Sequence, residues 1–192
     1  MCRIEQSAFN DCSCLFSLKI PDSITTIGNS AFLSFGPTSL TLPHSVTIGS
    51  RAFQKCDLIT SFTLSGRLTK VSSYTFLAAV GSPPSLCQIR SERLAERFLR
   101  MLGLRSLVLP HAVDDLGAGT SRHCSGLTFV QFPKKLTQIG SYTFSDCTGL
   151  TSIKLPSIVT SIGFKAFFGC TGLTSFAFPH AFKFAQKNAF MG

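Results

Sequence analysis

Residues 162–179 have the sequence IGFKAFFGCTGLTSFAFP, and residues 139–156 have the sequence IGSYTFSDCTGLTSIKLP. The two segments are 23 positions apart and keep isoleucine, glycine, phenylalanine, cysteine, leucine and proline at equivalent places. The same spacing separates further prolines and cysteines: Pro110, Pro133, Pro156 and Pro179, and Cys124, Cys147 and Cys170. A repeat of this length and regularity predicts a solenoid, in which each unit covers the apolar face of the next.

The same unit recurs in the first part of the chain with small deletions. Ile4, Ile27, Ile48 and Val71 open these earlier units. Ser121 replaces phenylalanine in the unit that opens at Leu116. We expect the phenylalanine column to be buried, because a single turn cannot cover its own apolar face. The column comprises Phe9, Phe32, Phe53, Phe76, Phe144 and Phe167.

Each unit also contains a short alternating segment before its proline. Ile153 and Leu155 alternate with Ser152 and Lys154, which is typical of a strand with one face turned inward. Proline at position 156 cannot donate to a ladder and is expected to end the strand. Residues 162–163 then bring the chain back inward. The predicted fold class is a repeat solenoid of short parallel strands, stacked about every 23 residues.

The pattern Ile-Gly-x-x-Ala-Phe-x-x-Cys-x-x-Leu-x-x-Ile-x-Leu-Pro is carried best by residues 162–179, and almost as well by residues 139–156. It resembles the leucine-rich repeat of the BspA-like type, and the resemblance covers the chain except for about residues 80–103. The resemblance implies a leucine-rich repeat solenoid. It also implies a microbial surface protein of the adhesion type, which binds proteins of a host or of neighbouring cells. The motif is specific for architecture, whereas a repeat scaffold hosts many ligands.

Residues 80–103 interrupt the array. Ser85 and Gln88 follow two prolines in a capping-box arrangement, and apolar residues at helical spacing predict a helix over residues 86–102. Three interpretations stay open: a basic recognition helix, a degenerate repeat whose turn has become a helix packed over the solenoid, and an artefact of translation or assembly. The predicted organisation is a leucine-rich repeat stack at 1–79, a helical insertion or degenerate repeat at 80–103 and a second stack at 104–192, within one continuous solenoid.

The cysteines and histidines form no pattern that indicates catalysis or metal binding. The five cysteines at one repeat position indicate small buried thiols, although bridging between stacked turns stays open: Cys12, Cys56, Cys124, Cys147 and Cys170. Cys12 and Cys14 are the one close pair, and no second pair or histidine group follows at zinc spacing. The sequence has no nucleophile motif and no phosphate-binding loop. We expect no catalytic residue, no metal site and no cofactor.

The formal net charge is +9, from 18 basic and 9 acidic residues. This charge promotes non-specific contact with anionic partners. The basic residues are scattered, however, and do not interleave with aromatic residues on the predicted strand face, so we expect no specific nucleic-acid binding. The longest stretch without acidic or basic residues, 23–50, is broken by prolines and glycines and predicts no membrane span.

The outward residues of the stacked strands form an extended face that suits protein ligands. This face is mostly small and hydroxylated, and Phe129 is its one large aromatic residue. We expect the contact patch to be formed by Phe129, Gln131, Ser152, Lys154 and Ser175. The sequence therefore predicts a non-enzymatic protein-binding scaffold.

Two localisations stay open. The family resemblance implies a fragment of a microbial cell-surface adhesion protein. If Met1 is the true start, the lack of an apolar leader favours a cytoplasmic protein-interaction scaffold instead. Neither end shows a polar capping unit, which predicts a fragment with exposed apolar ends and self-association.

Overall fold

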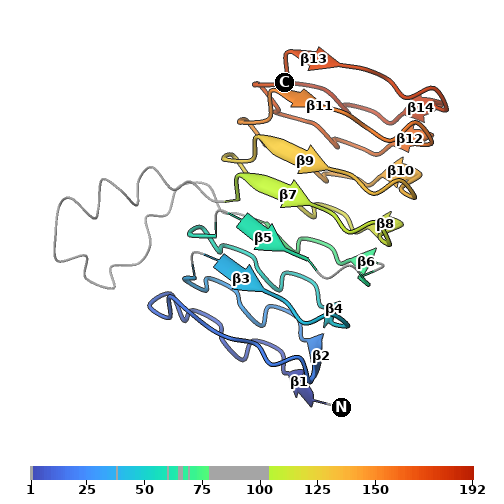
Figure 1. Ribbon diagram of the computed structural model, residues 1–192. Coiled ribbons are helices and arrows are strands. Elements are labelled where there is room, and N and C mark those ends of the chain that lie inside the picture. Colours follow the sequence, from blue (N-terminus) through green and yellow to red (C-terminus); the bar gives the residue numbers. More distant parts are fainter. Residues whose placement is uncertain (1, 38, 60, 65–66, 69, 78–103) are drawn as a thin grey trace, which may run out of the picture.

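The computed structural model describes residues 2–37, 39–59, 61–64, 67–68, 70–77 and 104–192. These residues wind through successive turns of a solenoid, with the two termini at opposite ends of the stack (Figure 1). The predicted repeat solenoid is confirmed by the parallel strands that recur with the sequence repeat. The predicted helix over residues 86–102 lies outside the described residues, as do all residues of the predicted insertion, 80–103.

One side of the turns forms a parallel sheet, which we call the front sheet. Its register follows the repeat, so that Ser106 lies opposite Phe129 and Ser152 lies opposite Ser175. Along the stack the strands are β3 (Ser39–Thr41), β5 (Ser61–Thr63), β7 (Ser106–Val108) and β9 (Phe129–Gln131), followed by the pair β11 (Ser152–Ile153) and β13 (Ser175–Phe176).

A second row of strands runs along another side of the turns, and we call it the side sheet (Figure 1). The sequence pattern did not predict these strands. Ile162, which was expected to bring the chain back inward, is a buried member of one of these strands, and Ile139 is a buried member of another. The row contains β1 (Cys2–Ile4), β2 (Ile24–Ile27) and β4 (Thr47–Ile48), then β6 (Lys70–Val71) and β8 (Asp115–Leu116), then β10 (Gln138–Ile139), β12 (Ser161–Ile162) and β14 (Phe184–Ala185).

The ladder continues between turns that precede and follow residues 78–103. β5 pairs with β7 in the front sheet, and β6 pairs with β8 in the side sheet. The Phe76 amide donates to the Thr120 carbonyl at 2.8 Å. These bonds join described turns on both sides of the interruption, whereas the division of the chain at residues 79 and 104 stays a prediction.

The core is a column of phenylalanine rings, as the sequence predicts. Phe32 lies between Phe9 and Phe53, with ring centroids 5.2 and 5.4 Å apart and nearly parallel planes. Phe144 and Phe167 stack in the same way at 5.5 Å. Phe9 is partly buried, and the other members are buried. Stacked rings in successive turns explain why phenylalanine recurs at this position.

Ser121 interrupts the phenylalanine column. Its side chain is fully buried, and its hydroxyl has no hydrogen-bond partner. Phe132 packs against the core in the same region, with its ring edge-on to Phe144 at 5.7 Å. Phe132, which directly follows β9, thus packs against the core in the region where the column has serine instead of phenylalanine.

The turn after each side-sheet strand contains residues with positive φ, a conformation that L-residues rarely adopt. Their amides donate to the next turn, as from Tyr142 to the Phe164 carbonyl at 2.9 Å and from Asp146 to the Phe168 carbonyl at 2.6 Å. We call the outer surface of these turns the turn face. The first positive-φ column contains Ser7, Ser30, Arg51, Tyr74, Gly119, Tyr142, Lys165 and Asn188.

Candidate protein-binding surface

The five residues of the predicted contact patch are all exposed on the front sheet or directly beside it. Phe129 and Gln131 belong to β9, and 52% of Phe129 is accessible to solvent. Ser152 and Ser175 lie opposite one another on β11 and β13. Lys154 comes just after β11, which ends at Ile153. The structure brings these residues onto one surface, and their binding role stays a prediction.

Val108 adds a second apolar side chain to this surface. It lies opposite Gln131 in the register of β7 and β9, and it is 45% exposed. Because β7 neighbours β9, Val108 and Phe129 lie on adjacent strands. Val108 is not one of the residues of the predicted contact patch. We call Val108, Phe129, Gln131, Ser152, Lys154 and Ser175 the front patch.

Threonines beside the strands have a structural role. The hydroxyl of Thr128 donates to the carbonyl of Arg105 at 3.2 Å, one repeat earlier. Thr174 donates in the same way to Thr151 at 3.5 Å. These hydroxyls satisfy carbonyl groups within the stack. The high threonine content at these positions is therefore explained by folding, and it does not count toward a ligand site.

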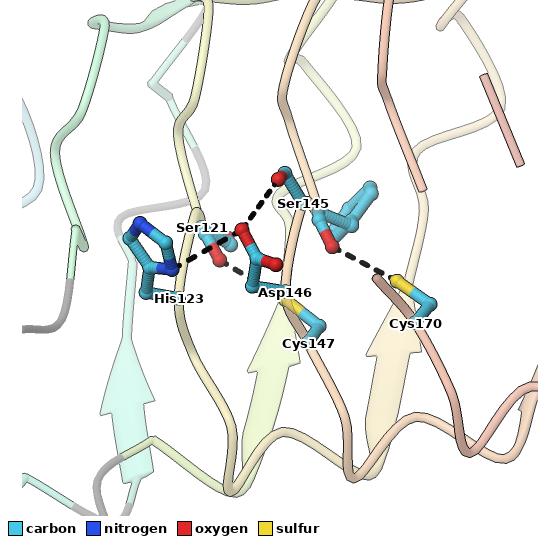
Figure 2. Close-up of polar contacts among 7 residues, drawn as sticks. Ser121, His123, Ser145, Asp146, Cys147 and Cys170 are labelled. Atoms are coloured by element: carbon cyan, nitrogen blue, oxygen red, sulfur yellow. Dashed lines mark hydrogen bonds and ion pairs between the residues drawn. The ribbon is translucent and has the colours of Figure 1, made fainter. Parts of the chain in front are cut away.

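A polar cluster on the turn face joins two neighbouring turns (Figure 2). The Ser145 hydroxyl donates to Asp146 Oδ2 at 2.7 Å, and His123 Nδ1 lies 3.2 Å from the same oxygen. His123 and Asp146 are 23 residues apart and so occupy one repeat position. Sequence analysis missed this pair, although the repeat spacing was a sufficient signal for it.

This cluster lacks the geometry of a catalytic triad. Ser145 is 1% exposed, and its hydroxyl is bonded to the carboxylate instead of to an imidazole base. Burial lowers the pKa of His123, and Arg122 adds to this effect, while the Asp146 carboxylate partly opposes it. A neutral histidine that is hydrogen-bonded to a neighbouring turn is a stabilising contact of the fold.

From Cys56 onward, the column cysteines donate their thiols to backbone carbonyls of an earlier turn. Cys147 Sγ lies 3.1 Å from the Ser121 oxygen, and Cys170 Sγ lies 3.0 Å from the Phe144 oxygen (Figure 2). Both are free thiols. Burial raises the pKa of Cys170 to about 11 and raises that of Cys147 well above its ordinary value. Cys147 and Cys170 are thus buried, protonated thiols, as their repeat position predicts.

In the part of the chain that the structure describes, no three histidine, cysteine or acidic side chains are grouped so as to hold a metal ion. These described residues also contain no helix that is long and apolar enough to cross a membrane.

The chain matches the family model described as the BspA type leucine rich repeat region, in six copies over residues 1–81 and 94–192. The match is broader than the resemblance seen in the sequence, because it includes residues 94–103. No curated protein sequence matches the chain significantly.

Several solved bacterial structures share the fold. A leucine-rich repeat protein of T. pallidum has a TM-score of 0.66 and 23% identity, over 90% of this chain and 72% of that protein. A leucine-rich cell surface protein of Faecalibacterium prausnitzii has a TM-score of 0.56 and 22% identity, over 98% of this chain and 54% of that protein. A leucine-rich repeat protein of Eubacterium ventriosum has a TM-score of 0.62 and 24% identity, over 84% of this chain and 38% of that protein. This chain therefore spans from about two fifths to about three quarters of these proteins.

The phenylalanine and cysteine columns, the parallel strands at the repeat spacing and the family match agree with one another. The chain belongs to the BspA-type leucine-rich repeat family.

Proposed function

We propose that the protein is a non-enzymatic scaffold that binds a protein partner through the front patch. The observation that supports this most directly is the exposure of Phe129 and Val108 on adjacent strands, on a face that is otherwise small and hydroxylated. A few anchor residues, often aromatic, supply most of the binding energy of protein interfaces, and exposed apolar patches mark interaction sites. Gln131 and Lys154 lie beside them and can provide polar contacts at the rim.

The partner is proposed to be a surface protein of a host or neighbouring cell, with this chain displayed on the cell surface as part of an adhesion-type protein. The family supports this proposal, as does the name of the F. prausnitzii neighbour, a leucine-rich cell surface protein. The alternative is a cytoplasmic protein-interaction scaffold without an adhesive role, which uses the same face.

Protease shaving of intact source cells separates these two settings. Release of the tryptic peptide 136–154 from unbroken cells, from a parent larger than 20.7 kDa, would support the displayed protein. Appearance of the peptide only after lysis, from a product of the predicted mass, would favour the cytoplasmic scaffold. As a control, a cytoplasmic marker protein must be absent from the released peptides, which shows that the cells stayed intact.

The front patch is tested by replacing Phe129 with serine and measuring capture of surface proteins by photo-crosslinking and mass spectrometry. Ile158→Ser is the matched control, because Ile158 is also an exposed apolar residue (42%) but lies outside the front sheet. We expect Phe129→Ser to abolish the crosslinks to one dominant partner and Ile158→Ser to preserve them. Equal crosslinking by both variants would contradict the proposed patch.

Self-association is a further part of this proposal. Phe178, Phe184, Phe190 and Met191 are all exposed apolar residues near the last two strands. Apolar surface of this kind favours association of the isolated chain. Sedimentation velocity should show a mass that rises with protein concentration, whereas a monomer at all concentrations would contradict this expectation.

A further inference from the structure

On the turn face, cations lie against aromatic rings. The Arg122 guanidinium lies 5.1 Å from the centre of the Tyr142 ring. Lys165 Nζ lies 4.6 Å from the Phe168 ring centre and 5.5 Å from that of Phe164. Tyr142 and Phe164 meet edge to face at 5.4 Å. We call these five residues the basic-aromatic strip.

The strip follows the ladder of the turn face. The Tyr142 amide donates to the Phe164 carbonyl at 2.9 Å, so the rings belong to adjacent turns. The pattern also occurs two turns earlier, where the Arg51 guanidinium lies 5.7 Å from the Tyr74 ring centre. Tyr74 lies close over Gly119, because a side-chain carbon added at Gly119 would come within 2.4 Å of this ring. Tyrosine rings flanked by cations thus recur along one face.

The Arg122 guanidinium can contact a ligand only through its terminal nitrogens, because its Nε atom is buried and has no hydrogen-bond partner. Stacking on a ring holds a guanidinium in place and desolvates one of its faces, while its edge can still bind an oxyanion bidentately. The nearby carboxylate of Asp146 already accepts from Ser145 and lies against His123. The charge balance of the whole chain, 18 basic to 9 acidic residues, also favours an anionic ligand.

We propose that the basic-aromatic strip binds an extended acidic segment of a partner protein, with carboxylates at alternate positions. The two cations of the strip, on Arg122 and Lys165, come from turns two apart, which is roughly 10 Å along the stack. Alternate side chains on one face of an extended peptide are about 7 Å apart, and the long arginine and lysine side chains can reach carboxylates at that spacing. The half-buried rings of Tyr142 and Phe164 supply apolar contact between the charges. This site is separate from the front patch.

The probe is a fluorescein-labelled peptide of alternating glutamate and serine, and the control peptide has glutamine in place of glutamate. Fluorescence anisotropy with the full chain at about 0.15 M salt measures the dissociation constant. We expect binding of the glutamate peptide and none of the glutamine peptide. Arg122→Gln and Lys165→Gln should each weaken binding about fivefold, and together roughly twentyfold. Circular dichroism confirms that each variant is folded.

Two controls make the test specific. Lys135→Gln removes an exposed charge outside the strip and should leave the affinity unchanged. Phe129→Ser alters the front patch and should also leave it unchanged, so failure of one site is distinguishable from failure of the other. If Lys135→Gln weakens binding as much as Arg122→Gln, or if a labelled oligothymidylate binds as tightly as the glutamate peptide, the affinity is a general effect of net charge and the proposal is wrong.

Discussion

Replacement of Phe144 by alanine tests whether the phenylalanine column holds the solenoid together. Phe144 is fully buried, stacks on Phe167 at 5.5 Å and meets Phe132 edge-on at 5.7 Å. Truncating a buried phenylalanine to alanine lowers the free energy of unfolding by about 3–5 kcal/mol, because apolar contacts are lost and a cavity remains. Each aromatic pair contributes about 0.5–1.5 kcal/mol beyond the buried area. Because Phe144 makes two such pairs, the Phe144→Ala substitution should cost about 4–5 kcal/mol, at the upper end of this range.

The measurement is urea unfolding of wild type and variants, followed by far-ultraviolet circular dichroism. Phe184→Ala is the matched control, because Phe184 is 54% exposed on β14 and should cost no more than about 0.5 kcal/mol. Phe144→Leu keeps most of the apolar volume and is expected to cost about 1.5 kcal/mol or somewhat more. Hydrogen exchange should show lost protection in the turns on both sides of residue 144.

A cost below about 1 kcal/mol for Phe144→Ala, or a cost equal to that of Phe184→Ala, would refute this reasoning. It would mean that the strands hold the turns together without the ring column. The double variant with Phe167→Ala gives a second check. Because the two rings are in contact, their costs should not be additive, whereas a distant pair would add within about 0.5 kcal/mol.

Three further predictions concern the polar and thiol groups near the core. Ser121→Ala removes a buried hydroxyl without a partner and should raise the free energy of unfolding by about 1 kcal/mol in urea titrations, whereas a loss of stability would show that the hydroxyl is satisfied. Burial lowers the pKa of His123 in the folded protein and so favours the neutral imidazole there. The free energy of unfolding should therefore be highest above pH 6.5, the ordinary pKa of histidine, and should decline as the pH falls from there through the lowered pKa of the folded state. His123→Asn suits the positive φ and should flatten that decline in pH-dependent melts; an unchanged slope would exclude His123 as its source. Iodoacetamide at about pH 8 should modify Cys147 and Cys170 only in denaturant, as judged by peptide mass spectrometry, and labelling of the native protein would contradict their raised pKa values.

The repeat made most of the inward-facing structure predictable. Equivalent positions 23 residues apart become neighbours in successive turns, so burial at Phe144 implies burial at Phe167. The outward residues followed from strand alternation, which correctly placed Phe129 and Gln131 on the surface. These inferences need only periodicity and the fact that one turn cannot bury its own face.

The side sheet and the turn face were harder to predict for a physical reason. The side strands are only two residues long in most turns, which is too short for alternation to show in the sequence. The positive-φ positions hold tyrosine, arginine and lysine, although glycine or asparagine is the usual signal for this conformation. The interturn hydrogen bonds compensate for the local backbone cost. The preference of a single residue type therefore does not predict positive φ at these positions, because the hydrogen bonds between stacked turns impose that conformation.

The pairing of His123 with Asp146 shows how surface sites are to be sought in this fold. Two residues at one repeat position lie side by side, whatever their separation in sequence, so chemistry must be sought along columns. Inward columns tolerate little change, and the exception at Ser121 is accompanied by the large Phe132. The outward column of the front sheet carries no such constraint, because the ladder uses backbone groups. Substitutions at the front patch should therefore alter recognition with little effect on stability, whereas a change at the His123–Asp146 pair of the turn face should also alter stability.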